Sequence, residues 1–151
     1  MITLIPALAL IVVTLVAVSS SYAAEIDRTA VDFKTPSEIK WVRNAAGTNE
    51  SAVLFGDPSK PGPYVVRIKW LPGNMSRPHF HPNDRFFVVL SGTWLMGTGE
   101  NFDPNNTVPA PAGSYVIHYA GKVHYDGAKD EEAIIQVWGM GPATSTPAGK
   151  R

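Results

Sequence analysis

One stretch of the sequence decides which fold to expect: GNMSRPHFHPNDRFFVVLSG, residues 73–92. It contains His79 and His81, two residues apart, so in an extended strand both imidazoles lie on the same face. Neutral imidazole nitrogen is a good ligand for first-row transition metals, and two on one face can fill adjacent coordination positions. The spacing therefore indicates a metal site, although two polar histidines in an exposed loop would show the same pattern.

The chain beyond residue 24 has the pattern of short strands separated by turns. Gly- and Pro-rich segments interrupt it at short intervals, and no long stretch has the helical period. A loop rich in Gly, Asp, Asn and Pro is expected at residues 97–111. Apolar runs predict strands at residues 38–43, 52–55, 64–71, 86–90, 93–96, 115–117 and 133–138. This spacing is typical of an all-β sandwich or barrel.

Length and composition limit the kind of protein. The 151 residues suffice for one ordinary domain, and 13 Lys+Arg against 13 Asp+Glu leave no basic surface for a nucleic-acid partner. The absence of cysteine excludes disulfides, thiolate zinc sites and iron–sulfur clusters. No phosphate-binding loop or serine-hydrolase elbow occurs. A glycosidase would need a pair of catalytic carboxylates, but the spacing of the candidates does not indicate such a pair. The candidates are Asp84, Glu100, Asp103 and Asp126.

The N-terminus matches the pattern of a secretory signal peptide. The apolar run from Leu4 to Val18 is shorter than the ~20 residues that span a bilayer, and Ser21-Tyr22-Ala23 fits a cleavage site. No Lys or Arg precedes the run, so an uncleaved anchor is the alternative. We expect a periplasmic or secreted protein with no membrane span in its mature form. The expected organisation is a signal peptide at 1–23, an N-terminal arm at 24–48, a β-barrel at 49–140 and a flexible C-terminal tail at 141–151.

The stretch around the two histidines resembles the first motif of the cupin superfamily, G(x)5HxH(x)3–4E(x)6G. Arg85 stands where the family usually has its Glu ligand. The positions that match the motif are Gly73, His79, His81 and Gly92. The residues of this stretch are most similar to those of small single-domain bacterial cupins.

The second cupin motif, G(x)5PxG(x)2H(x)3N, resembles the sequence that begins at Gly113. Gly121 and His124 also match it, whereas Tyr119 and Ala128 replace its Pro and Asn. The whole resemblance implies a cupin-type double-stranded β-helix, a jelly-roll barrel. It also implies one divalent transition metal, Fe, Mn, Zn, Ni or Cu, whose ligands would be His79, His81 and His124.

Arg85 is the informative departure from the family pattern. A guanidinium stays protonated and has no lone pair, so it cannot replace a carboxylate ligand. One interpretation is a three-histidine site similar to thiol and diketone dioxygenase cupins, with Arg85 and Tyr115 as substrate contacts. In a second, His118 or, after it, Asp84 supplies a further ligand; the alternative for His118 is a buried, hydrogen-bonded histidine. In a third, the metal is lost and the pocket binds an anion or a sugar.

The function expected from these residues is an extracytoplasmic metal-binding cupin that acts on a small-molecule ligand. A metal-dependent dioxygenase or oxidoreductase for a small organic acid or diketone-like compound is one form of it. A non-catalytic ligand- or metal-binding or sensing cupin, and a metal-assisted isomerase or lyase, are the alternatives. The sequence identifies no catalytic residue and leaves open whether the protein is an enzyme. Aromatic residues beyond the needs of one core, Trp41 and Trp70 among them, indicate a homodimer.

Overall fold

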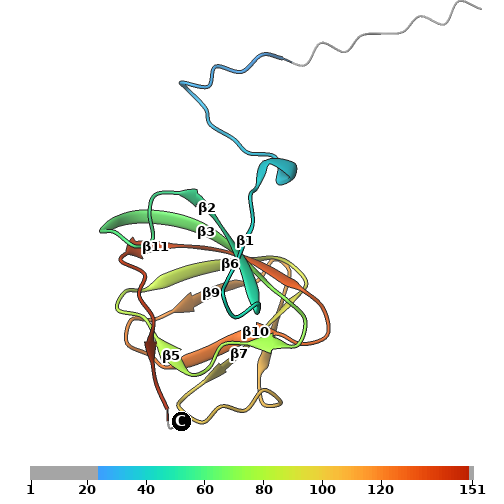
Figure 1. Cartoon of the computed structure of the whole chain (residues 1–151), viewed down its shortest axis with the longest axis vertical. Helices are drawn as coiled ribbons and strands as arrows, with labels where there is room; N and C mark the ends of the chain where they lie inside the picture. The colour runs from blue at the N-terminus through green and yellow to red at the C-terminus, as the bar shows by residue number, and fades with distance from the viewer. Residues whose placement is uncertain (1–23, 150–151) are drawn as a thin grey trace, which may run out of the picture. The chain divides into compact units, whose positions relative to one another are not determined.

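Two antiparallel β-sheets make up the fold of this chain in a computed structural model that describes residues 24–149 (Figure 1). The expected signal peptide at 1–23 lies outside the described residues. The chain divides into two units, and the described part of the first, residues 24–33, contains a turn but no strand. All strands belong to the second unit, which begins at Lys34. Within the described residues, no helix is long and apolar enough to cross a bilayer.

The larger sheet has six strands in the order β1-β2-β3-β11-β6-β9. A single 3-10 turn, η1 (Pro36–Glu38), precedes it. Its strands are β1 (Val42–Arg43), β2 (Asn49–Phe55), β3 (Gly62–Trp70), β11 (Ala133–Gly141), β6 (Arg85–Ser91) and β9 (Tyr115–His118). The strand β11 lies between β3 and β6 and pairs with both along most of its length.

The smaller sheet follows the order β12-β5-β10-β7-β8, and β4 also pairs with β10. Its strands are β12 (Thr146–Pro147), β5 (His79–Phe80), β10 (His124–Ala128), β7 (Thr93–Thr98), β8 (Val108–Pro111) and β4 (Asn74–Met75). The two stacked layers are visible in Figure 1. This arrangement confirms the predicted all-β class and the jelly-roll barrel.

The hydrophobic core forms where the strands turn alternate side chains inward. In β11 the inward positions Ala133, Ile135 and Val137 are at most 1% exposed, and in β6 Phe87 and Val89 are at most 2% exposed. Burying such a side chain contributes about 1.5–3 kcal/mol. The core therefore holds the larger sheet against the inner side of the smaller one.

Two glycines allow the close approaches that shape the barrel. Gly92 has a φ of +69° in the turn between β6 and β7, and a Cβ there would overlap the Glu132 carbonyl oxygen. Gly127 lies in β10, where a Cβ would overlap the carbonyl oxygen of Asn74 in β4. Only a glycine lets these backbones approach so closely.

Several strand predictions need correction. The expected loop at 97–111 contains β8, and the expected strand at 38–43 forms regular pairing only at Val42–Arg43. The strand β10 was not predicted, because its sequence HYDGA includes Asp and Gly, which are depleted in strands. Trp70 is a core residue, 6% exposed, so it does not support a homodimer, which stays a prediction.

Candidate metal centre

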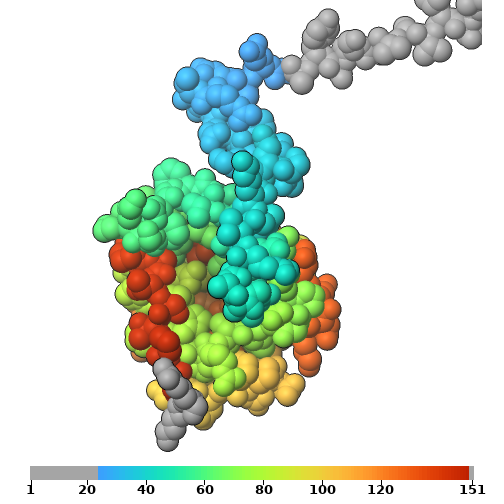
Figure 2. Space-filling model, in the orientation of Figure 1, coloured from blue at the N-terminus to red at the C-terminus, as the bar shows by residue number. Residues whose placement is uncertain are grey.

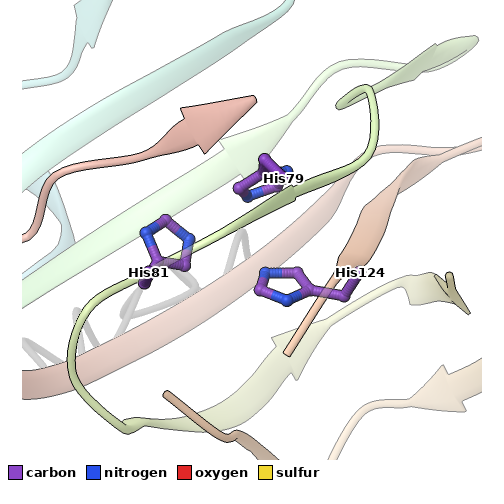
Figure 3. A group of neighbouring side chains, drawn as sticks. All are labelled: His79, His81 and His124. Atoms are coloured by element: carbon purple, nitrogen blue, oxygen red, sulfur yellow. The ribbon is translucent and has the colours of Figure 1, made fainter. Parts of the chain in front are cut away.

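Three histidine rings meet inside the barrel, as the cupin resemblance implied. His79 is the first residue of β5, His81 follows that strand, and His124 begins β10. Antiparallel pairing places His79 directly opposite His124. The ring centroids lie 4.9 Å apart for His79 and His81, 4.5 Å for His79 and His124, and 5.3 Å for His81 and His124. Figure 3 shows the three side chains turned toward one another.

The main chain fixes the tautomer of each ring. In all three histidines, Nδ1 lies at hydrogen-bond distance from a backbone carbonyl oxygen, which can only accept, so Nδ1 must carry the proton. The pairs are His79 with the Arg77 oxygen at 2.8 Å, His81 with the Thr144 oxygen at 2.8 Å and His124 with the Lys122 oxygen at 2.9 Å. Each Nε2 consequently keeps its lone pair.

This donor set fits a divalent transition metal. One ligand atom from each histidine lies within 4.8 Å of the others, and His124 Nε2 is buried without a hydrogen-bond partner. Burial lowers the pKa of His81 to about 3 and that of His124 to about 4, and the Arg85 charge also lowers the pKa of His81. Both imidazoles are therefore neutral at pH 7, which is the form that binds a metal.

Arg85 is turned into the same cavity. Its Nη1 donates a hydrogen bond to His81 Nε2 at 2.6 Å, and its guanidinium carbon lies 5.1 Å from the centroid of the Phe87 ring. Asp84 does not accompany it. The Asp84 carboxylate accepts a hydrogen bond at 2.7 Å from the Ala120 N–H and is not among the residues that line the histidine cavity.

His118 and Asp126 extend the polar cluster. The centroid of the His118 ring lies 3.8 Å from that of His124. The same ring packs on Phe87 and Trp94, with centroid distances of 4.6 and 5.3 Å. Burial lowers the pKa of His118 to about 2, and its buried Nδ1 has no hydrogen-bond partner. Together with His124 and Asp126 it forms a second group whose ligand atoms lie within 4.8 Å of one another. His118 is therefore buried as expected, but its Nδ1 lacks the hydrogen bond of the structural alternative, and its position fits a further ligand.

Asp126 lies in the site although its sequence spacing indicated no role for it. Its side chain is 6% exposed, and burial raises the pKa of its carboxyl group. It is two residues after His124, so strand alternation would have placed both on one face if β10 had been predicted.

The cavity has a volume of about 230 Å³, and its lining includes His79, His81, Arg85 and Asp126. Asn49 and Ser145 line it too, and Figure 2 shows the barrel hollowed between the teal segment near β2 and the red C-terminal segment. The segment expected as a flexible tail contacts the site. The Thr144 backbone oxygen accepts a hydrogen bond from His81 Nδ1, and β12 pairs with β5.

Tyr115 lies outside this cavity. Its side chain is 57% exposed, its ring centroid lies 6.1 Å from that of Trp138, and it does not line the pocket. A larger hollow of about 730 Å³ has Phe55, Phe86 and Trp138 in its lining and none of the histidines. Its lining is mostly apolar, whereas His79, His81, Arg85 and Asp126 line the smaller cavity.

Comparisons with known proteins agree with this fold. The family described as ChrR Cupin-like domain matches residues 29–143. No curated protein matches the sequence.

Solved structures with the same fold include three of different kinds. The polyketide cyclase RemF from Streptomyces resistomycificus is 15% identical with a TM-score of 0.66, over 80% of this chain and 87% of that one. An RmlC-like cupin from Shewanella frigidimarina is 14% identical with a TM-score of 0.57, over 74% and 90%. The DMSP lyase DddQ from Ruegeria pomeroyi is 14% identical with a TM-score of 0.57, over 74% and 61%. At these identities the likeness shows the fold alone.

Proposed function

This chain belongs to the ChrR cupin-like domain family, and from that premise we propose that it binds one divalent transition metal and a small organic acid in a single cavity. The metal ligands are His79, His81 and His124, each through Nε2. Arg85 is the contact for the acid. The metal is one of Fe, Mn, Zn, Ni and Cu, since three imidazoles accept most of that series.

The observation that carries the metal proposal is the set of three Nδ1 contacts to backbone carbonyls. A ligating histidine almost always donates its other ring N–H to such an acceptor, which orients the ring and raises the basicity of the ligand nitrogen. Here all three candidate ligands have that contact, at 2.8 to 2.9 Å. The three contacts also leave all three Nε2 lone pairs available in one place, since a ligand atom from each ring lies within 4.8 Å of the others.

The proposed substrate class follows from Arg85. A guanidinium forms two parallel hydrogen bonds to a carboxylate, and Arg85 has an inward position with its Nε unpartnered. The cavity of about 230 Å³ suits a compound of a few non-hydrogen atoms. A small carboxylate or a diketone-like enolate fits both the charge and the size.

The reaction we propose is oxidation of that compound by dioxygen, which is the second reactant and takes up the electrons that the organic acid loses. A bound metal with only three protein ligands supplies open positions and redox or Lewis-acid chemistry. Around it, Arg85 holds the acid and neutralises its charge, while Phe87 and Trp94 form an apolar wall that limits access of water. These residues bind and orient the reactant, and orientation is itself a large contribution to rate.

The metal content of the purified protein tests the proposal first. After loading with metal in the presence of a small carboxylate, inductively coupled plasma mass spectrometry is expected to give about one metal per chain for the wild type and none for His81→Ala. Tyr115→Phe is the matched control, because it alters an aromatic residue outside the cavity and should leave the metal content unchanged. Metal that is absent from the wild type, and cannot be loaded at micromolar concentration even with the carboxylate present, would contradict the proposal.

An oxygen electrode then tests the oxidation. The loaded protein is mixed with a panel of small 2-oxo acids, hydroxy acids and diketones, and oxygen uptake that His81→Ala lacks supports an oxidase or dioxygenase. Tight binding of one of these acids with neither oxygen uptake nor product would instead favour a non-catalytic binding or sensing cupin. Product formed without oxygen uptake would favour an isomerase or lyase.

We also propose that the protein works outside the cytoplasm, on the pattern of residues 1–23. Expression in a bacterial host followed by fractionation should place it in the periplasm or medium, with a mature N-terminus near residue 24. A full-length chain in the cytoplasm would argue against export, and one in the membrane fraction would indicate the uncleaved anchor.

A further inference from the structure

The hydrogen bond between Arg85 and His81 has a consequence for metal loading. A neutral imidazole has one acceptor nitrogen, and the carbonyl of Thr144 makes Nε2 that nitrogen in His81. Arg85 Nη1 donates to this same atom at 2.6 Å. A metal at 2.0–2.1 Å from the nitrogen would need the lone pair that Arg85 now engages. Arg85 and a metal therefore compete for His81.

The net charge of the site also opposes metal binding when no anion is present. The usual cupin glutamate would bring a charge of −1 to the ligand set, whereas Arg85 brings +1, a difference of two charges. Three neutral imidazoles compensate none of the metal charge. Asp126 is the single carboxylate in the lining of the cavity, so a metal and Arg85 together leave an excess positive charge there. A buried excess charge of this size is unfavourable unless an anion enters with the metal.

Arg85 is also left partly unsatisfied. Its Nε is buried without a hydrogen-bond partner, and within residues 24–149 it forms no ion pair with a carboxylate. Arg85 is half-buried, and a charged side chain that is partly withdrawn from water is normally paired. The Phe87 ring beneath it holds the cation inside the cavity, where an anion could reach it.

We propose that Arg85 is an anion-dependent latch on the metal site: it occupies His81 Nε2 in the metal-free cavity, and a small carboxylate draws it away so that metal and anion bind cooperatively. This inference rests on the proposed function, because it needs the three-histidine metal site. It adds a rule for loading, namely that the metal binds weakly until an organic anion is present. By linkage, the metal raises the affinity for the anion by the same factor.

The test measures Co²⁺ affinity with and without a carboxylate. Metal-free protein is titrated with Co²⁺ and followed by its visible absorbance, in sodium perchlorate and in sodium acetate at equal ionic strength and pH, with free Co²⁺ corrected for its acetate complex. Acetate should lower the Kd of the wild type for Co²⁺ at least fivefold, since couplings of this kind span about 5- to 150-fold.

Variants at Arg85 separate the latch from the metal site. Arg85→Gln removes the charge, so Co²⁺ should bind more tightly than to the wild type in perchlorate, with an acetate effect below twofold. Arg85→Glu supplies a carboxylate of its own and should bind tightly in both salts. Arg67→Gln is the matched control: Arg67 donates to Gln136 on the sheet, does not line the cavity, and should leave the wild-type behaviour intact.

Two results would overturn the proposal, and they are distinguishable. If the wild type binds Co²⁺ equally in the two salts, or in neither, the latch is refuted. If Arg85→Gln and Arg85→Glu also give no Co²⁺ absorbance while circular dichroism shows them folded, the metal centre itself is refuted with it.

Discussion

Mild acid should destabilise the metal-free protein, and His118 provides the sharpest test. Burial holds the pKa of His118 at about 2, whereas a histidine in an unfolded chain titrates near ~6.5. As the pH falls below 6.5, the unfolded chain binds a proton at this position and the folded chain does not. The stability that His118 contributes is therefore fully present above about pH 6.5 and is lost progressively toward pH 2.

The size of the effect follows from the same two pKa values. Each pH unit below ~6.5 lowers the free energy of unfolding by about 1.4 kcal/mol for one such group. At pH 5 the loss from His118 is about 2 kcal/mol, and His81 and His124, whose pKa values are also lowered by burial, act in the same direction. A domain of this size has a stability of only about 5–15 kcal/mol, so the loss is measurable.

The variant His118→Phe removes the titration and keeps a ring in contact with Phe87 and Trp94. Urea unfolding in EDTA, followed by tryptophan fluorescence at pH 7.5 and pH 5, gives the free energy of unfolding under both conditions. The difference between the two pH values should be about 2 kcal/mol smaller in the variant than in the wild type. The control Val89→Ala changes a buried, non-ionisable residue and should lower both values equally. An unchanged pH difference in His118→Phe would refute a neutral, buried His118.

Two further changes test other parts of the structure. Deleting residues 144–151 removes the Thr144 carbonyl that orients His81, so the affinity for the metal, measured by calorimetry, should fall about 10- to 100-fold. The control Thr144→Val keeps that carbonyl and should keep the affinity. Equal losses in the two variants would mean that the Thr144 side chain matters instead of its carbonyl. Gly127→Ala places a Cβ against the Asn74 carbonyl, so thermal unfolding should show a loss of about 1–3 kcal/mol, and an unchanged melting temperature would show that β4 does not pack there.

The sequence predicted those features that depend on local periodicity or on a spaced motif. The i,i+2 spacing of His79 and His81 puts both rings on one face, and this is a property of any extended segment. The position of His124 beside them came from the resemblance to a family, because no local rule brings together residues more than forty positions apart. The structure confirms both placements through the pairing of β5 with β10.

The remaining site features depend on contacts that no periodicity encodes. Arg85 follows His81 after a turn, so strand alternation does not carry across, and its inward direction required the structure. The place of Asp126 in the site was missed because β10 contains Asp126, Gly127 and Ala128, which are residues depleted in strands, and is stabilised by pairing on both sides. The acceptor for His81 is a backbone carbonyl of Thr144, which has no signature in the side chains at all.

The places of β10 and β11 in the two sheets constrain how the chain acquires its fold. These strands lie next to each other in sequence near the C-terminus, yet β11 separates β3 from β6 and β10 separates β5 from β7. Until residues 124–141 have been synthesised, each sheet consists of separate fragments with unpaired edges. Assembly of both sheets must therefore wait until β10 and β11 have been synthesised, and its many non-local pairings make it slow.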